Sequence, residues 1–231
     1  MIKIESVNQL YGGTQILWDL NLNIAKGSCT CVMGRNGVGK TTLLKCLMGL
    51  LPVKDGKILL DGEDFTRRSA ESRARNGIGY VPQGRDIFPL LTVEENLRVG
   101  LAARKDKAKH IPERIFDLFP VLKDMMHRRG GDLSGGQQQQ LAIGRALVID
   151  PKVLILDEPN EGIQPNIVHQ IGDVITKLNE EEGMTVVLVE QKLGFARRVG
   201  KEFRLMEKGR VVASGAMPEL NDELVARHLA V

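Results

Sequence analysis

Nine consecutive residues in the first fifth of the chain have the types and spacing that could hold phosphate groups. They read Gly34-Arg35-Asn36-Gly37-Val38-Gly39-Lys40-Thr41-Thr42 and begin with a match to the pattern G-x-x-x-x-G-K-[ST]. The glycines let backbone N–H groups turn toward phosphate oxygens. The lysine can reach the β- and γ-phosphates, and the first threonine hydroxyl can ligate Mg²⁺. A strand before the motif and a helix after it would support this interpretation over a glycine-rich turn that binds nothing.

Two carboxylates end an apolar stretch in the middle of the chain. Val153-Leu154-Ile155-Leu156 is followed directly by Asp157 and Glu158. Ligands of open parallel sheets bind at the carboxyl ends of the strands, so both side chains would face a bound ligand. Asp157 would hold Mg²⁺, directly or through water, and Glu158 would orient and deprotonate an attacking water. Alone the motif could be an acidic surface loop, but beside the phosphate loop it indicates nucleotide hydrolysis.

A third motif, Leu133-Ser134-Gly135-Gly136-Gln137, lies between the other two. Ser134 and Gln137 have the spacing of a capping box, which is the purely structural interpretation. The two glycines would also expose the first N–H groups of the helix, so its positive end could bind a second phosphate.

These motifs, in this order, resemble those of the ATP-binding-cassette ATPases, and the resemblance covers essentially the whole chain. It implies ATP and Mg²⁺ as cofactors, ATP hydrolysis coupled to transport across a membrane, and cassettes that pair head to tail. In such a pair each ATP lies between one phosphate loop and the partner's Ser134–Gln137 segment. The resemblance also implies that Tyr11 stacks on adenine. Gln83, in Val81-Pro82-Gln83, would touch Mg²⁺ and link the nucleotide to a helical subdomain.

Two positions depart from the usual cassette pattern. Gln164 stands where an aspartate is usual, and Gln191 replaces the histidine that normally follows the last core strand. A glutamine can still donate a hydrogen bond to the γ-phosphate, but it cannot become a cation. We therefore expect Gln191 to assist catalysis as a neutral donor.

The same departures narrow the resemblance. Gln137–Gln140, the Glu161–Pro165 segment and Val189-Glu190-Gln191 resemble the ATPases of branched-chain amino acid importers. Within that group, the Tyr80–Phe88 segment and the ending Arg227–Val231 are most similar to the urea or amide branch. The resemblance implies permease subunits, a second cassette, identical or different, and an indirect periplasmic solute-binding partner. The chain would then be peripheral on the cytoplasmic face of the inner membrane.

Composition agrees with one cytoplasmic α/β protein. The 231 residues contain 32 basic and 29 acidic side chains, a balance that does not imply a nucleic-acid partner. No run of 18 or more apolar residues occurs, and the N-terminus lacks the apolar segment of a secretory signal. Cys29, Cys31 and Cys46 are expected to be reduced core thiols. The basic run Arg104–Lys109 is expected to be a solvated loop, with a lipid or partner contact as the alternative.

The elements that must position these residues follow from periodicity and turn signals. We expect one nucleotide-binding domain over 1–231, with a mostly parallel core sheet, an N-terminal antiparallel part and a helical subdomain over about 92–131. Asp55-Gly56 and Asp61-Gly62 would form turns between short hairpin strands. The predicted strands are 2–7, 20–24, 28–33, 78–81, 153–156, 185–189, 203–206 and 211–214. The predicted helices start at Lys40, Thr92 and Pro112 and span 134–148, 165–178 and 218–229.

Other functions for the same motifs remain as alternatives. DNA-repair and chromosome ATPases insert long coiled coils between the loop that corresponds to Gln83 and the motif that corresponds to Ser134–Gln137. In this chain Gln83 and Ser134 are only about 50 positions apart. Soluble translation factors carry two cassettes in one chain, and this chain has one. A nucleotide-gated module that does not hydrolyse ATP would not need Glu158. Transport is therefore the favoured function.

Overall fold

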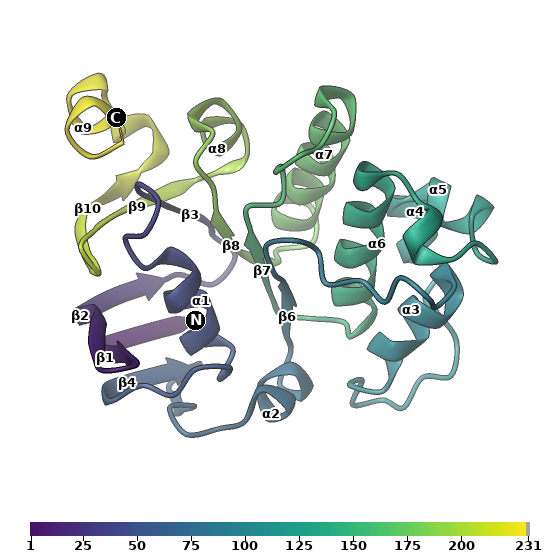
Figure 1. Ribbon diagram of the computed structural model, residues 1–231, viewed down its shortest axis with the longest axis horizontal. Helices are drawn as coiled ribbons and strands as arrows, with labels where there is room; N and C mark the ends of the chain where they lie inside the picture. Colours follow the sequence, from purple (N-terminus) through teal and green to yellow (C-terminus); the bar gives the residue numbers. More distant parts are fainter. Residues whose placement is uncertain (230–231) are drawn as a thin grey trace.

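A six-stranded sheet carries the phosphate-binding and acidic motifs at the ends of its strands (Figure 1). The computed structural model describes residues 1–229. The strand order is β10-β9-β3-β8-β7-β6, and every pair is parallel except β9–β10. The strands are β3 (Cys29–Met33), β6 (Ile78–Val81), β7 (Val153–Asp157), β8 (Thr185–Val189), β9 (Glu202–Glu207) and β10 (Arg210–Ala216). The mostly parallel core sheet predicted from the sequence is confirmed.

The central strands are apolar throughout because both faces of this sheet are covered. Every residue of β3, β7 and β8 is buried. In β7, Val153 and Ile155 belong to one hydrophobic core, and Leu154 and Leu156 belong to the other. Successive side chains of a strand point to opposite faces, so one short strand joins two cores.

The first core lies between this sheet and the predicted N-terminal antiparallel sheet. That sheet has the order β2-β1-β4-β5. Its strands are β1 (Ile2–Tyr11), β2 (Thr14–Ile24), β4 (Asp55–Leu60) and β5 (Glu63–Asp64). Helix α1 (Lys40–Leu47) lies in the same core and buries Leu43, Leu44 and Leu47, as predicted. The amino end of α1 is thereby fixed against both sheets.

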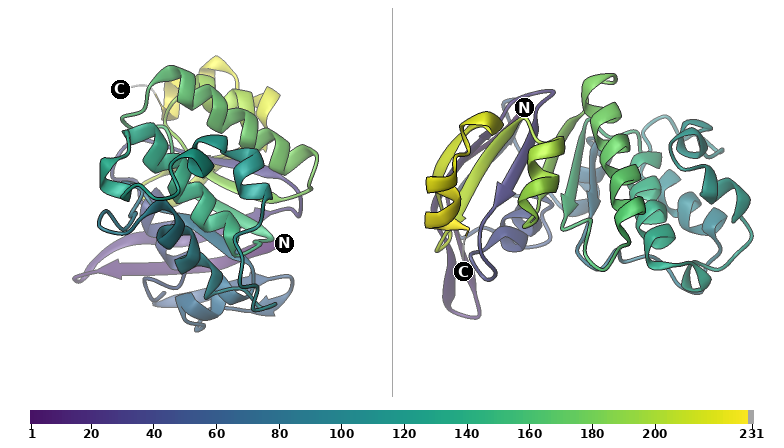
Figure 2. Two further views of the ribbon diagram at one scale, coloured as in Figure 1. Left: turned by 90° about the vertical axis from the view of Figure 1, so that its right-hand side faces the viewer. Right: turned by 90° about the horizontal axis from the view of Figure 1, so that it is seen from above.

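The second core holds the other face of the parallel sheet against helices. Helices α6 (Gly135–Val148), α7 (Pro165–Glu180) and α8 (Leu193–Val199) cover it, and α3 (Val93–Leu101), α4 (Arg114–Leu118) and α5 (Pro120–Asp124) lie beyond α6. Figure 2 shows α3–α5 at the end of the molecule farthest from the N-terminal sheet. The capping box at the start of α3 is confirmed. Thr92 N donates to Glu95 Oε2 at 2.7 Å, and Glu95 N donates to the Thr92 hydroxyl at 3.2 Å.

Several element boundaries differ from the prediction. The helix expected to start at Pro112 begins at Arg114 and ends at Leu118, because Phe119 adopts φ −135°, ψ 75° and a new helix starts at Pro120. The helix expected over 218–229 is a 3₁₀ turn (Met217–Glu219) followed by α9 (Asp222–His228). Asp61-Gly62 forms a turn, but Asp55-Gly56 begins β4 instead of separating two strands. β5 is the second strand of the hairpin expected at Asp61-Gly62. Helix α2 (Ala70–Arg75) and the 3₁₀ turn Gly130–Asp132 were not predicted.

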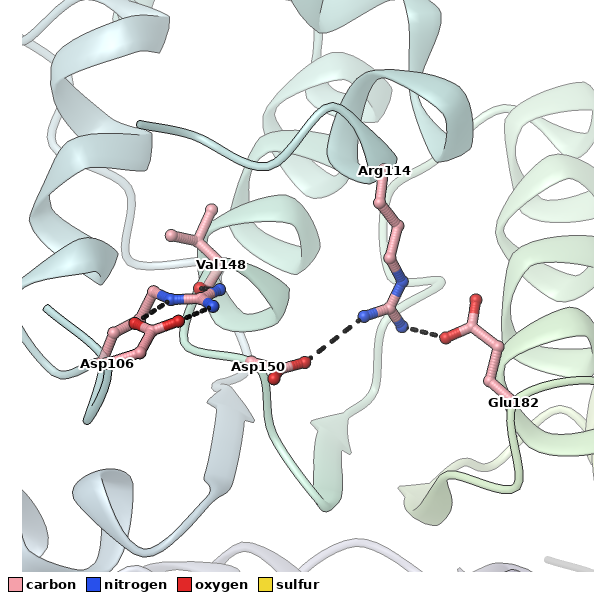
Figure 3. Close-up of polar contacts among 6 residues, drawn as sticks. Asp106, Arg114, Val148, Asp150 and Glu182 are labelled. Atoms are coloured by element: carbon pink, nitrogen blue, oxygen red, sulfur yellow. Dashed lines mark hydrogen bonds and ion pairs between the residues drawn. The ribbon is translucent and has the colours of Figure 1, made fainter. Parts of the chain in front are cut away.

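The amino-end edge of the parallel strands is held by ion pairs (Figure 3). Arg104 donates to the Val148 carbonyl at 2.9 Å and pairs with Asp106, and its side chain is only 13% exposed. Arg114 pairs with Glu182 and, at 3.7 Å, with Asp150. The prediction that the Arg104–Lys109 run is entirely solvated is therefore wrong at Arg104, which binds a carbonyl in the last turn of α6. In residues 1–229 no helix is long and apolar enough to span a bilayer.

Candidate nucleotide-binding and hydrolysis site

The phosphate loop joins β3 to α1, which is the strand-to-helix context expected from the sequence. The backbone here accepts only glycine at some positions. A Cβ atom on Gly34 would lie 2.5 Å from the Met206 carbonyl oxygen, and Gly39 has φ 105°. Tight packing against β9 and a left-handed residue before the helix therefore set the curve of the loop. The structure leaves Arg35, Asn36 and Gly37 exposed and Val38 half-buried.

Lys40 is the first residue of α1 and is 5% exposed. Its Nζ donates to the carbonyl oxygens of Gly34 at 2.8 Å and Arg35 at 2.9 Å. Burial lowers the pKa of Lys40, and the carboxylates of Glu158 and Asp157 oppose that shift. A phosphate oxygen in the loop would offer the ammonium group a charged acceptor, which binds it more strongly than a carbonyl does.

Asp157 ends β7 with both carboxylate oxygens buried and no hydrogen bond of normal geometry to either within residues 1–229. Burial raises the pKa of Asp157 to about 6, the Thr41 hydroxyl opposes the shift, and the Glu158 carboxylate adds to it. A buried carboxylate without donors is costly unless a cation or hydrogen bonds compensate it. Asp157 beside Thr41 therefore fits a magnesium site completed by phosphate oxygens.

Glu158 lies at the meeting point of three segments. Its backbone is left-handed, with φ 49°, and its N–H donates to the Val189 carbonyl of β8 at 2.9 Å. Gln191 Nε2 donates to Glu158 Oε1 at 2.5 Å, and Gln83 Nε2 lies 3.5 Å from Glu158 Oε2. Gln83 makes a shorter bond of 3.0 Å to Glu161. The structure thus brings together Gln83, Glu158 and Gln191, three residues that are widely separated in the sequence.

The Ser134–Gln137 segment begins α6 with the predicted capping box. Ser134 N donates to Gln137 Oε1 at 2.9 Å, and Gln137 N donates to the Ser134 hydroxyl at 3.3 Å. Among the described residues, the side-chain hydrogen bonds of Ser134 and Gln137 join them to each other, and none joins them to Lys40 or Thr41. Both residues line a cavity of about 580 Å³ together with Gln164, on the side of α6 that faces α7.

Tyr11 ends β1 and is 60% exposed. The β1–β2 hairpin lies beside the phosphate loop, since Ile16 and Leu17 pack within 3.3 Å of a Cβ position on Gly39. The structure places Tyr11 near the tip of this hairpin with its side chain exposed.

Sequence reasoning assigned no role to three residues that the structure places at the site. Arg85, with φ 75°, donates from Nη1 to Gln138 Oε1 at 3.0 Å and packs on Gly135. Asn160 and Glu190 are buried and bonded to each other at 2.7 Å. Glu190 follows the buried strand β8 directly, as Glu158 follows β7. Its position directly after an apolar strand could have marked Glu190 as a candidate site residue from the sequence.

Comparison with known proteins places these features in a family. A family model described as ABC transporter matches residues 17–161. The high-affinity branched-chain amino acid transport ATP-binding protein BraG of Pseudomonas aeruginosa is 40% identical, covering 92% of this chain and 91% of its own length. The probable branched-chain amino acid transport ATP-binding protein LivF of Archaeoglobus fulgidus is 38% identical, covering 95% and 94%.

Solved structures agree with the fold. A dimeric ATP-binding cassette in a post-hydrolysis state, bound to ADP and phosphate, superposes with a TM-score of 0.84 at 28% identity. The match covers 94% of this chain and 99% of that one. The phosphate loop, the Ser134–Gln137 motif and the acidic strand end all lie within residues 17–161, which the family model matches. The chain belongs to the ABC transporter family, as an ATP-binding and ATP-hydrolysing subunit.

Proposed function

We propose that this chain is the motor subunit of an importer and that its catalytic centre is the edge where Lys40, Glu158 and Gln191 lie. The observation that carries the proposal is the contact of Gln191 and Gln83 with the two oxygens of Glu158. Both amides would hold the carboxylate toward a water molecule at the γ-phosphate. Glu158 is then the base and Gln191 the neutral donor that keeps water and phosphate in line.

ATP would lie along the phosphate loop. The phosphates would be held by the backbone N–H groups of residues 34–39, the ammonium group of Lys40 and the hydroxyl groups of Thr41 and Thr42. Tyr11 would stack on adenine. Thr41, Gln83 and Asp157 would hold Mg²⁺, which neutralises the phosphate charge that develops during transfer. Glu158 accepts a proton from water as the water oxygen bonds to the γ-phosphorus. The bond from that phosphorus to the bridging oxygen of ADP then breaks.

Ser134, Gly135, Gly136 and Gln137 would act on the ATP of a second cassette. The side chains of Ser134 and Gln137 hydrogen-bond within this segment. The amino end of α6 offers N–H groups and a positive dipole. We assign residues 92–131 to a helical subdomain that moves with this surface. Gln83 would couple the state of the nucleotide to the position of this helical subdomain through the 82–92 segment.

The two relatives are named as branched-chain amino acid transport ATP-binding proteins, which supports a role in transport. The partners of an importer subunit would be permease subunits, a second ATPase chain and an external solute-binding protein. The chain would dock on the cytoplasmic face of the membrane through the permease. Urea or short amides are the proposed solute, because of the Tyr80–Phe88 segment and the ending at 227–231. Of that ending, Ala230 and Val231 lie outside the described residues. A branched-chain amino acid is the second candidate, favoured by the names of two relatives.

Glu158→Gln tests the catalytic assignment. The amide keeps the size of the side chain and removes the base, so ATP affinity should be retained and turnover should fall by about 1000-fold. Glu182→Gln, which removes an acidic partner of Arg114 at the opposite edge, is the matched control. Turnover near that of the native chain would remove Glu158 from the role of base.

Radiolabelled uptake tests the solute. Deleting the gene for this chain should abolish urea uptake at low external concentration and largely spare leucine uptake. Plasmid-borne Glu158→Gln should fail to restore uptake, which ties the phenotype to ATP turnover. The reverse pattern, with leucine uptake lost, would assign the chain to the amino acid branch.

A further inference from the structure

A buried carboxylate joins the two loops that carry Glu158 and Gln191. Glu190 is 3% exposed and Asn160 is fully buried. Asn160 Nδ2 donates to Glu190 Oε2 at 2.7 Å. The other oxygen of Glu190, Oε1, accepts the backbone N–H groups of Gln191 and Lys192, both at 2.8 Å. Three donors therefore converge on one carboxylate.

The connection closes into a ring. Lys192 Nζ donates back to the Asn160 carbonyl at 3.1 Å, so the two loops are joined in both directions. The N–H of Glu190 also donates to the Val32 carbonyl at 3.3 Å, one residue before the end of β3. The ends of β3, β7 and β8, neighbours in the sheet (Figure 1), are thus tied at one point behind the catalytic edge.

We infer that Glu190 is a positioning residue for hydrolysis, because it fixes Gln191 against Glu158 through Asn160. This inference rests on the roles proposed for Glu158 and Gln191. Asn160 lies two residues after Glu158, and Gln191 follows Glu190 directly. Glu190 therefore sets the relative position of the base and the neutral donor. Supporting groups of this kind hold the reacting geometry within a fraction of an ångström.

Charge burial argues for this role over simple packing. A buried carboxylate is costly unless donors compensate it, and an apolar side chain would pack against Asn160 without that cost. The cation in the network, Lys192 Nζ, bonds the Asn160 carbonyl and not Glu190. The carboxylate is thus used to gather N–H groups from two separate loops.

The inference is tested by reversing the buried hydrogen bond in the full chain. Glu190→Gln gives the Gln191 and Lys192 N–H groups a neutral acceptor and puts an N–H₂ group against Asn160, whose amide must turn over to accept from it through its unpartnered Oδ1. Asn160→Asp places two carboxyl groups face to face. Each single variant should lower kcat for ATP hydrolysis by about tenfold, while the Kd for ATP stays within about twofold. The double variant restores a donor–acceptor pair, so its kcat should return to within about threefold of the native value.

Asn179→Ser is the matched control. Asn179 is equally buried and bonds the carbonyls of Gly27 and Met184, but it lies at the opposite edge of the sheet. Its replacement should lower the melting temperature without changing kcat per folded molecule. Hydrogen exchange at the Gln191 and Lys192 amides supplies a second measurement, since these should exchange faster in Glu190→Gln and recover in the double variant.

Two results would overturn the inference. One is a double variant whose kcat loss equals the product of the two single losses, because the pair would then be uncoupled. The other is single variants that melt earlier but keep native kcat and native exchange at Gln191 and Lys192. If Glu158→Gln retains turnover, the proposed function fails instead, so the two failures are distinguishable.

Discussion

Lys40, the first residue of α1, donates hydrogen bonds to the Gly34 and Arg35 carbonyl oxygens of the preceding loop. These bonds hold its ammonium group in place for the proposed phosphate contact. In the proposed site, Lys40→Ala would remove the main cationic contact to the β- and γ-phosphates. Charge-assisted hydrogen bonds contribute about 1.5–3 kcal/mol each, so ATP affinity should fall by about 100-fold. Titration of fluorescent ATP measures the loss, and Lys54→Ala, an exposed lysine, is the control. Equal affinity for the Lys40 and Lys54 variants would contradict the phosphate-loop assignment.

Gln191 is one of the two residues, with Gln164, where the sequence departs from the usual cassette pattern. Its amide bonds Glu158, which fits a donor at the γ-phosphate, but it cannot add a positive charge. Exchanging a charge-assisted bond for a neutral one costs about 1 kcal/mol, or several-fold in rate. Gln191→Ala should therefore slow the assembled transporter further, and Gln191→His should leave it active or quicken it. Steady-state ATP turnover at saturating ATP measures both.

The contrary result for Gln191 is specific. If the residue only steadies the start of α8, Gln191→Ala would lower the melting temperature and leave turnover per folded molecule intact. That outcome would remove Gln191 from the catalytic centre.

At the scale of elements, α1 is held at its carboxyl end by a buried arginine of α2. Arg73 is 1% exposed and donates to the carbonyl oxygens of Cys46 and Leu47 at 2.8 and 2.7 Å, and to Phe65 at 2.7 Å. Burial lowers the pKa of Arg73, and the carbonyl oxygens compensate its charge. The last turn of the phosphate-loop helix is thereby satisfied by a side chain that is distant in sequence.

Arg73→Met should destabilise the fold by about 3 kcal/mol, because the carbonyl acceptors lose their donors. Urea unfolding followed by circular dichroism measures the change. Arg75→Met on the same helix is the control, since Arg75 pairs with Glu71 on the surface and such pairs contribute about 0–1 kcal/mol. Similar losses in both variants would show that helix α2, not the buried guanidinium, is responsible.

The sequence predicted elements with strong periodicity and missed those defined by tertiary contacts. β6 and β8 match their predicted bounds because each is a short apolar run. Helix α2 has one buried residue, Arg73, so its pattern carries no apolar stripe. The helix break at Phe119 was missed because apolar periodicity continues across Pro120, although a proline there marks a helix start.

At the scale of the whole molecule, the sequence motifs predict which residues form the proposed site, but they do not predict the contacts between those residues. Glu158, Gln191 and Gln83 meet because β6, β7 and β8 are neighbours in the sheet, and no local pattern specifies that order. The Glu190–Asn160 bond was missed for the same reason. Local motifs identify phosphate chemistry; the strand order decides which loops touch.

Cassette pairing is the prediction that belongs to this scale. Glu158→Gln with Mg²⁺ and ATP should form a dimer in light scattering, either with its own copy or with the partner cassette when that is added, because bound ATP is not consumed. Adding Ser134→Arg should prevent the dimer and leave ATP binding intact, since Ser134 makes no hydrogen bond to its own phosphate loop. Ser214→Arg, an exposed serine on β10, is the control. A Ser134→Arg variant that still dimerises with ATP would refute the assignment of this surface.

The position of β3 in the middle of the sheet has a consequence for synthesis on the ribosome. Val32 of β3 lies opposite Val189 of β8 on one side and Arg204 of β9 on the other. Both neighbouring strands are synthesised more than 150 residues after β3, so β3 can pair with them only late in synthesis. Pairing across such separations is slow, because the intervening chain must be ordered first. Arrested nascent chains ending near residue 180 should therefore not be retained on ATP-agarose, while chains reaching residue 229 should be. ATP can therefore stabilise the complete cassette by binding to it, but ATP cannot assist the folding of the first half of the protein while that half leaves the ribosome.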